Sequence, residues 1–126
     1  LYYRGFPIEG ISINDASGLS RSNKITTKLI STFLYKMRSN SNFKYYNSSL
    51  SILGVRGTLS NKLRNSNISG KFFGKTGTLS NVFSLSGYLY KKNKTYVISI
   101  IQNSNNVDVN RTFKLLSDIY KLDNCV

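Results

Sequence analysis

At 126 residues and 14.2 kDa, the chain has the size of one ordinary domain or of a part of a larger one. Its 40% hydrophobic and 13% aromatic residues, with a single proline, exclude wholesale disorder. The absence of His and the presence of only one Cys argue against a zinc site, and we expect no metal and no cofactor.

The balance of charge is strongly basic, with 18 Lys and Arg against 5 Asp and Glu and a formal net charge of +13. Three interpretations are open: a nucleic-acid surface, attraction to anionic membranes or cell-wall polymers, and the compositional bias of an AT-rich genome. The charges are spread along the chain without a block of five or six like charges. This even spread favours compositional bias.

The chain contains neither a membrane-spanning run nor a recognisable signal peptide. Its longest apolar candidate, Tyr96–Ile101, is far shorter than the roughly 18 residues that a membrane helix needs. The sequence begins with Leu1, and Leu1–Gly10 lacks the basic-then-apolar layout of a signal peptide. We therefore expect a cleaved product or a fragment. The lone Cys125 forms no internal disulfide and indicates little about the redox compartment.

The first half of the sequence predicts an extended segment, a loop and a helix. Pro7–Asn14 alternates in the manner of a short strand and ends at the loop Asp15–Gly18. Apolar residues at helical spacing predict a helix from Ile25 to about Arg38, with Asn23 placed to cap it. Phe43–Leu53 is ambiguous.

The second half predicts three strands followed by an amphipathic helix. The strands are expected at Lys71–Thr76, Val82–Tyr90 and Thr95–Gln102, with a hairpin turn at Lys91–Lys94. The helix runs from Val109 to the end of the apolar pattern. Strands joined by short connections pair antiparallel, so we predict an α+β fold with helices packed on a face of the sheet.

Gly74–Leu79 is the sharpest local signal in the sequence. Lys75 places a positive charge at a sheet edge, and Thr76 offers a hydroxyl to a carboxylate. Gly77 has no Cβ, so a ligand backbone can lie against the strand. This pattern suits a peptide or acyl substrate with a free carboxylate, but a simple structural turn remains the alternative.

A second signal is the polar stretch Asp15–Asn23 at the expected helix start. Hydroxyls and an amide held on such a loop are able to donate and relay protons beside a nucleophile. The alternative is a Ser/Asn loop that only caps the helix.

Together the motifs resemble the C-terminal part of the class C low-molecular-mass penicillin-binding proteins, the serine-type D-alanyl-D-alanine carboxypeptidases and endopeptidases of the bacterial periplasm. That family has Asp-x-Ser-Gly-Leu-Ser-Arg-x-Asn, then Gly-x-x-Gly-Thr-Leu, then Lys-Thr-Gly-[Thr/Ser]-Leu. Here these stand at Asp15–Asn23, Gly54–Leu59 and Lys75–Leu79, and Val82–Tyr88 is similar to the family's next strand. Order and approximate spacing agree from about Ile11 to Tyr120.

The resemblance implies an acyl-enzyme mechanism, in which the serine of a Ser-x-x-Lys motif attacks the carbonyl between two D-alanines. It implies two catalytic residues here, Ser20 as the loop serine that assists proton transfer and Lys75 as the cation beside the substrate carboxylate. The implied partners are peptidoglycan stem peptides ending in D-Ala-D-Ala and, for the intact enzyme, β-lactams; the implied location is the periplasm. The residues implied to bind substrate are Asn23, Thr76, Gly77 and Thr78, with the amide after Gly77 near the oxyanion.

Two departures from the family pattern matter. The resemblance implies that the loop serine belongs to a Ser-x-Asn-type loop, but a strict Ser-x-Asn triplet from Ser20 fails, because position 22 is Ser22 and the amide follows at Asn23. The only literal Ser-x-x-Lys is Ser41–Lys44, and it follows the Ser20 loop, whereas the family places its nucleophile well before that loop. Chance alone gives about two such matches in a chain of this composition.

We therefore expect residues 1–126 to form a single partial domain, the C-terminal part of a penicillin-binding catalytic domain. The N-terminal part of the same protein is then its missing partner, and the chain alone is expected to be inactive. Without the remaining strands the sheet has an open apolar edge, so we expect the isolated chain to be poorly soluble or molten.

Two other hypotheses remain at this point. The first is a small basic module that binds nucleic acid or another anionic polymer, since 9 Tyr and 7 Phe are able to stack on bases. These aromatics lie mainly in apolar-patterned segments, however, and no nucleic-acid-binding signature is present, so no nucleic-acid partner is expected. The second is an accessory piece that complements a separate chain bearing Ser-x-x-Lys.

Overall fold

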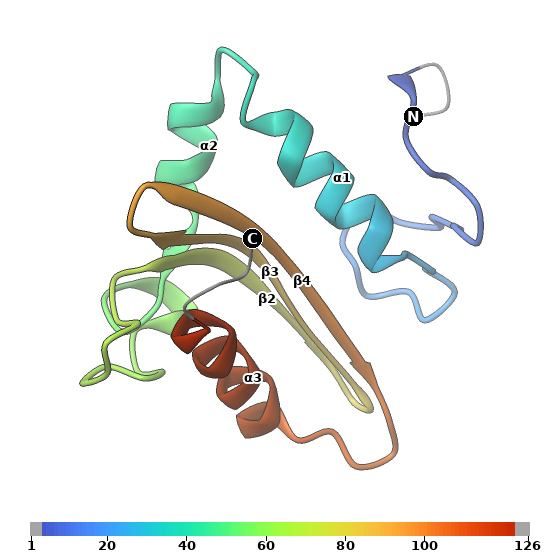
Figure 1. Cartoon of the computed structure of the whole chain (residues 1–126). Helices are drawn as coiled ribbons and strands as arrows, with labels where there is room; N and C mark the ends of the chain where they lie inside the picture. Colours follow the sequence, from blue (N-terminus) through green and yellow to red (C-terminus); the bar gives the residue numbers. More distant parts are fainter. Residues whose placement is uncertain (1–3, 123–126) are drawn as a thin grey trace.

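The computed structural model describes residues 4–122 as a four-stranded antiparallel sheet with helices on both faces (Figure 1). The strand order is β1-β2-β3-β4. This arrangement confirms the predicted α+β class, although the helices cover both faces of the sheet rather than one. In chain order the elements are α1 (Thr27–Met37), α2 (Phe43–Ser49), β1 (Ser51–Ile52), the 3-10 turn η2 (Gly57–Leu59), β2 (Phe72–Leu79), β3 (Val82–Lys91), β4 (Lys94–Asn103) and α3 (Val109–Lys121).

Two tight hairpins join the three long strands. β2 and β3 pair up to Leu79↔Val82, and β3 and β4 pair up to Lys91↔Lys94, so each connection has only two residues. Asn81 and Lys92 have φ angles of 66° and 52°, the left-handed conformation that two-residue hairpin turns require. The three predicted strands and the turn at Lys91–Lys94 are thus confirmed; β2 begins one residue later and ends three residues later than predicted, and β3 and β4 extend slightly beyond their predicted bounds.

The predictions for the N-terminal segment need correction. The expected strand Pro7–Asn14 is reduced to one isolated bridge, Ser12↔Lys24. The first helix begins at Thr27, and its cap is Thr26, whose hydroxyl accepts a hydrogen bond from the Leu29 amide at 3.1 Å. Asn23 does not cap the helix, because its side chain is hydrogen-bonded within the preceding loop.

The region that the sequence left ambiguous, Phe43–Leu53, divides into α2 and the two-residue strand β1. The chain turns away from the sheet at Gly54, where φ is +71°. A Cβ at Gly54 would lie 2.3 Å from Ser69 Oγ. This close approach and the turn explain why β1 ends so soon.

Two hydrophobic layers enclose the sheet, and β3 contributes to both by alternation. Leu85 and Leu89 face α3, whereas Tyr88 faces α1 and α2. The buried Tyr88 hydroxyl donates to the Leu34 carbonyl of α1 at 2.8 Å, and burial raises the pKa of this phenol. The larger layer consists of Leu53, Leu59, Ile68, Phe72, Phe83, Leu85, Leu89, Ile98, Phe113 and Leu116.

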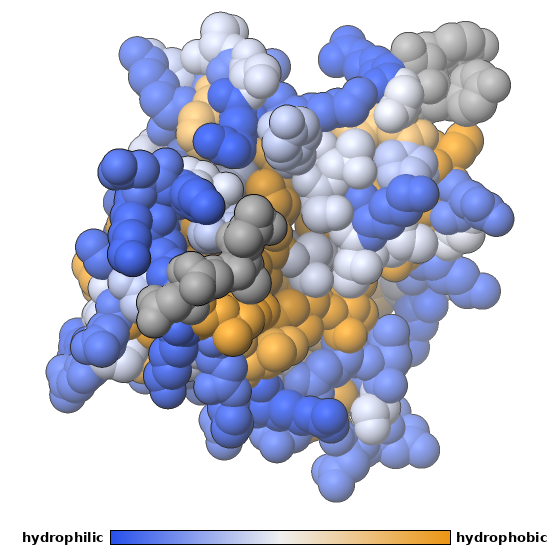
Figure 2. Space-filling model, viewed as in Figure 1, coloured by the Kyte–Doolittle hydropathy of each residue, from blue (hydrophilic) through white to orange (hydrophobic). Residues whose placement is uncertain are grey.

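The outer side of β4 bears no further strand within residues 4–122. Apolar residues of this strand, such as Val97, Ile100 and Ile101, are only half-buried. Figure 2 shows hydrophobic residues gathered between α1 and α3, where Figure 1 places β4. The open apolar edge expected from the sequence is therefore present.

No helix in the described part of the chain is long and apolar enough to cross a membrane. Cys125 lies outside the described residues.

Candidate functional site

A groove of about 920 Å³ lies between the loop before α1 and the far ends of the long strands. The loop Asp15–Asn23 forms one wall, and Lys75–Leu79 of β2 forms the other. The two motifs that the sequence singled out, more than fifty residues apart, therefore share one groove. Strand residues Val82, Ser84, Ile101 and Asn103 complete its lining.

Asp15 holds the loop together by accepting hydrogen bonds from three groups of the loop. One carboxylate oxygen, Oδ1, accepts from the Gly18 amide at 2.8 Å and from Asn23 Nδ2 at 2.9 Å. The other, Oδ2, accepts from the Ser20 amide at 2.8 Å. These bonds, chiefly that of Asn23, lower the pKa of Asp15, and desolvation opposes them. The loop shape thus depends on an ionised Asp15.

The other predicted loop residues take part in the same network. Ser20 is half-buried, lines the groove, and accepts a hydrogen bond from the Ser22 amide at 3.2 Å through its Oγ. Asn23 Oδ1 accepts from the Asn14 amide at 2.7 Å and from the Asp15 amide at 3.3 Å. The side-chain amide of Asn23 therefore forms its hydrogen bonds within the loop and maintains the shape of the loop.

Arg21 fastens the loop to the turn between β2 and β3. Its guanidinium donates to the Ser80 carbonyl at 3.1 Å through Nη1 and to the Ser80 hydroxyl through Nη2. Ser80 was not among the predicted site residues, because a serine in a polar hairpin turn carries no signal of such a contact. This pair fixes the width of the groove at one end.

β2 changes character halfway along its length. Phe73 and Gly74 pair with β1, but Lys75–Leu79 pairs only with β3. Among the described residues, nothing pairs with the outer edge of this second half, and the edge faces the groove. An exposed strand edge offers backbone donors and acceptors to an extended peptide.

Lys75, on this open half, carries a charge suited to a carboxylate. Lys75 is exposed, and its ammonium donates to the Thr76 carbonyl at 2.6 Å. Together with Arg21 and Lys24 it gives the groove a positive lining, which only Asp15 offsets. Within the described chain, no cluster of His, Cys, Asp or Glu is suited to hold a metal ion.

Gly77 lies close to a side chain of the neighbouring strand. A Cβ at this position would lie 2.6 Å from Ser84 Oγ on the neighbouring strand. Besides its predicted contact with a ligand, Gly77 therefore has a packing role against Ser84, which the sequence pattern did not reveal.

Ser41 and Lys44, the only literal Ser-x-x-Lys pair, do not line the groove. Ser41 lies in the connection from α1 to α2 and Lys44 in the first turn of α2, at the other end of α1 from the loop (Figure 1). An 11-residue helix is about 16 Å long. The Lys44 ammonium instead lies over the Tyr45 ring, 4.8 Å from its centroid.

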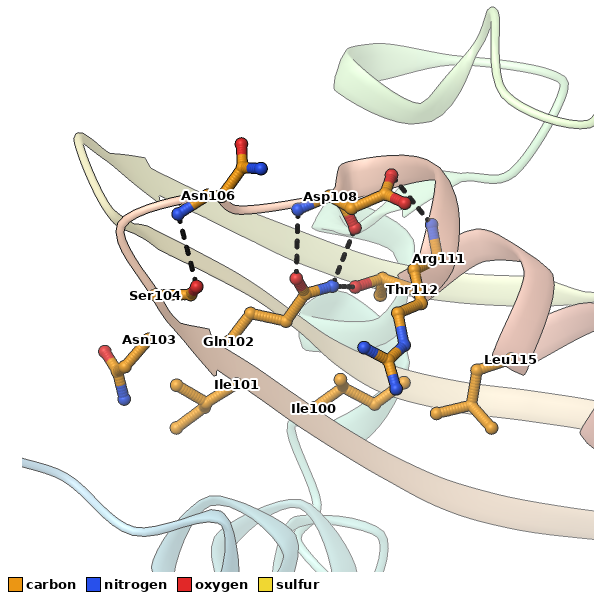
Figure 3. Close-up of a pocket in the computed structure, with 10 residues that line it drawn as sticks. All are labelled: Ile100, Ile101, Gln102, Asn103, Ser104, Asn106, Asp108, Arg111, Thr112 and Leu115. Atoms are coloured by element: carbon orange, nitrogen blue, oxygen red, sulfur yellow. Dashed lines mark hydrogen bonds between the residues drawn. The ribbon is translucent and has the colours of Figure 1, made fainter.

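A smaller hollow of about 360 Å³ lies between β4 and the start of α3 (Figure 3). Gln102 Nε2 donates to the Asp108 carbonyl at 2.8 Å and to the Thr112 hydroxyl, and Gln102 Oε1 accepts from the Asp108 amide at 3.2 Å. Asp108 Oδ1 in turn caps α3 by accepting from the Asn110 and Arg111 amides. These groups bond to one another and anchor the helix, so the hollow is a structural junction.

Comparisons with known proteins agree with this geometry. The D-Ala-D-Ala carboxypeptidase 3 (S13) family matches residues 1–119. A D-alanyl-D-alanine carboxypeptidase of Actinomadura sp. (strain R39) is 35% identical over 104 residues, which are 79% of this chain and 19% of that protein.

The fold is also that of solved penicillin-binding proteins. Penicillin-binding protein 4 of Haemophilus influenzae has a TM-score of 0.79 and 24% identity over 95% of this chain, both alone and complexed with a novel β-lactam. The chain spans 30% and 31% of those two structures, so it corresponds to less than a third of these relatives. The match over residues 1–119 shows that the chain belongs to the D-Ala-D-Ala carboxypeptidase 3 (S13) family.

Proposed function

We propose that this chain supplies the carboxylate-binding wall of a serine-type D-Ala-D-Ala carboxypeptidase that acts on peptidoglycan peptides. The observation that carries the proposal is the open edge of Lys75–Leu79, which faces the Asp15–Asn23 loop across one groove. An open edge suits an extended peptide, and a positive lining suits the free carboxylate at its end.

In this proposal the terminal D-Ala-D-Ala lies along β2 as an added strand. The hydroxyls of Thr76 and Thr78 and the ammonium of Lys75 bind the terminal carboxylate. The amide after Gly77 stabilises the oxyanion, where a fixed donor has its strongest effect.

The nucleophilic serine belongs to the remainder of the enzyme in this proposal. Its oxygen attacks the carbonyl between the two D-alanines, and the C–N bond breaks so that the last D-Ala leaves with a proton. Water then hydrolyses the acyl-enzyme. We assign Ser20 to proton transfer beside this serine, and Asn23 to substrate binding through the loop shape that it maintains. The periplasm and acylation by β-lactams are parts of the same proposal.

The test is acylation of the native gene product by benzylpenicillin, followed by intact mass spectrometry. We expect one penicilloyl adduct, and we expect Lys75→Ala to slow acylation by a factor on the order of 10²–10³, as loss of a preorganised charge-stabilising group does. Lys71→Ala is the matched control, because Lys71 is exposed just before β2 and does not line the groove.

Two results would contradict the proposal. One is the absence of an adduct on the native product, and the other is an adduct on a serine of these 126 residues, such as Ser41. Equal acylation rates for the Lys75→Ala and Lys71→Ala variants would remove Lys75 from the proposed site.

A further inference from the structure

Three hydroxyl groups form a chain that ends at Thr76. Ser51 Oγ lies 3.3 Å from Thr58 Oγ1, and Thr58 Oγ1 lies 3.3 Å from Thr76 Oγ1. Ser51 Oγ also accepts a hydrogen bond from the Thr58 amide at 3.2 Å. Thr58 belongs to the Gly54–Leu59 motif, to which the proposed function gives no role, and it does not line the groove.

The loop that carries Thr58 is firmly held against the sheet. Leu59 and Leu53 are fully buried, and the Gly54 amide donates to the Leu59 carbonyl at 2.9 Å. Gly57 has a φ of +69°, and a Cβ there would lie 2.3 Å from Ser51 Oγ. Glycine at this position therefore lets the loop approach Ser51 closely enough to bring Thr58 to Thr76.

The direction of this chain decides what Thr76 is able to do. A carboxylate only accepts hydrogen bonds, so Thr76 must donate its hydroxyl proton to bind one. If Ser51 donates to Thr58 and Thr58 donates to Thr76, each of the three hydroxyl oxygens accepts one hydrogen bond. The hydroxyl proton of Thr76 is then free to be donated to a ligand. The Thr58 amide, which donates to Ser51 Oγ, favours this direction because it occupies an acceptor site of the first hydroxyl.

From this geometry we propose that Thr58 is a positioning residue: through its hydroxyl it sets the rotamer and proton direction of Thr76, so that Thr76 donates to the terminal carboxylate of the peptide. The proposal rests on the carboxylate site proposed above. Both hydroxyl contacts, at 3.3 Å, leave room to shorten when a ligand polarises the chain.

The test compares wild type, Thr58→Val and Thr58→Ser in the native gene product. Valine has the shape of threonine without its hydroxyl, and serine keeps the hydroxyl. The affinities of an N-acetylated D-Ala-D-Ala peptide and of its C-terminal amide give the preference for a carboxylate. We expect Thr58→Val to lower this preference about three- to tenfold, the effect of one lost hydrogen bond, and Thr58→Ser to stay within about twofold of wild type.

A double-mutant cycle with Thr76→Val separates positioning from a general structural effect. If Thr58 acts through Thr76, Thr58→Val has no further effect on the carboxylate preference in the Thr76→Val background. Additive losses, or equal preferences in the Thr58→Val and Thr58→Ser variants, would overturn the proposal.

A second readout keeps this inference distinct from the proposed function. With ¹³C-labelled threonine methyl groups, we expect Thr58→Val to shift the Thr76 methyl signal of the free protein and Thr58→Ser to leave it nearly in place. An unmoved Thr76 signal in Thr58→Val would overturn the positioning role. The wild-type protein could instead bind the peptide amide as tightly as the acid while Thr58→Val still shifts the Thr76 signal. That result would refute the carboxylate site and retain the positioning role.

Discussion

The two halves of β2 show how one strand serves two purposes. Phe72–Gly74 is hydrogen-bonded on both sides; Phe72 and Gly74 are buried and Phe73 is half-buried, with Phe72 fully enclosed by the layer under α3. Lys75–Leu79 is paired on one side only, carries polar residues, and faces the groove. The change occurs opposite Ser51, where β1 begins, because the chain before β1 belongs to α2 and not to the sheet.

This difference separates the residues that stabilise the fold from those available to a ligand. Replacing a buried residue in the first half removes packing, whereas the second half is paired with β3 alone and has one open edge. A strand anchored at one end in a rigid core holds its open end in a fixed position. Phe72–Gly74 and the pairing with β3 therefore both hold the proposed site in place, although Phe72–Gly74 does not line the groove.

The largest expected effect concerns the unpaired sheet edges of the isolated 126-residue chain. The outer side of β4 exposes half-buried apolar residues and an unpaired backbone, which is a template for association with another chain. We expect self-association or a broad, non-cooperative urea transition for this chain alone. Sedimentation as a 14.2 kDa monomer together with a sharp unfolding transition would contradict this expectation.

Substitutions in the two halves of β2 should differ strongly in their effect on stability. In the native gene product we expect Phe72→Ala to lower the free energy of unfolding by about 3–5 kcal/mol, because it opens a cavity in a fully buried site. Thr78→Ala, at an exposed position, should change it by less than about 0.5 kcal/mol. Urea titration measures both values. Equal losses would mean that the open half also contributes to the core.

Two glycines allow a finer comparison. A Cβ at Gly87 would lie 2.1 Å from the Phe73 carbonyl oxygen, and backbone cannot give way. A Cβ at Gly77 would meet the Ser84 hydroxyl at 2.6 Å, with the Ser84 Cβ farther away at 3.9 Å. We expect Gly87→Ala to cost about 3 kcal/mol or more, and Gly77→Ala about 1 kcal/mol.

The control for this comparison is Ser84→Ala. It should restore the stability of the Gly77→Ala variant, because it removes the one atom that clashes, and it should leave the Gly87→Ala variant unimproved. Hydrogen exchange of the β2 and β3 amides measures both. Failure of Ser84→Ala to rescue Gly77→Ala would show that the open half of β2 is constrained by something other than Ser84.

The regular elements were predictable from sequence because their patterns are local. Val82–Lys91 alternates between two buried layers, and α3 repeats its apolar residues at helical spacing. The same reasoning failed at Asn23, because a residue suited to cap a helix is equally suited to bind a loop carboxylate. Asp15 takes the Asn23 side chain, and Thr26 caps the helix instead.

The two motifs of the candidate site were predictable from the sequence, but the contacts that join distant stretches were not. Ordered motifs pointed to both walls of the groove, since each motif is a short continuous stretch. The contacts that join distant stretches, Arg21 with Ser80 and Thr58 with Thr76, leave no periodicity or composition that a sequence displays. They depend on how the loops pack on the sheet, and only the three-dimensional arrangement shows them.

The smallest expected effect concerns acid. Asp15 holds the groove loop by accepting hydrogen bonds, and its pKa lies below the ordinary value of 3.8. The ionised group therefore stabilises the loop at every pH above about 4, and this contribution is lost as the pH falls through the lowered pKa. We expect the Gly18 and Ser20 amide signals, followed by NMR from pH 7 to pH 2, to move together only in the acidic limb of the titration.

Two variants show whether the titration of Asp15 causes this acid transition of the loop signals. Asp15→Asn removes the titrating group, so the Gly18 and Ser20 signals should lose their shared acid transition. Asp118→Asn is the matched control, because Lys114 lowers the pKa of Asp118 in the same direction on α3, away from the groove. If the loop signals titrate identically in the Asp15→Asn variant, Asp15 is not the residue that holds the groove wall. In that case Lys75–Leu79, held by its pairing with β3, would be the only fixed wall of the proposed site.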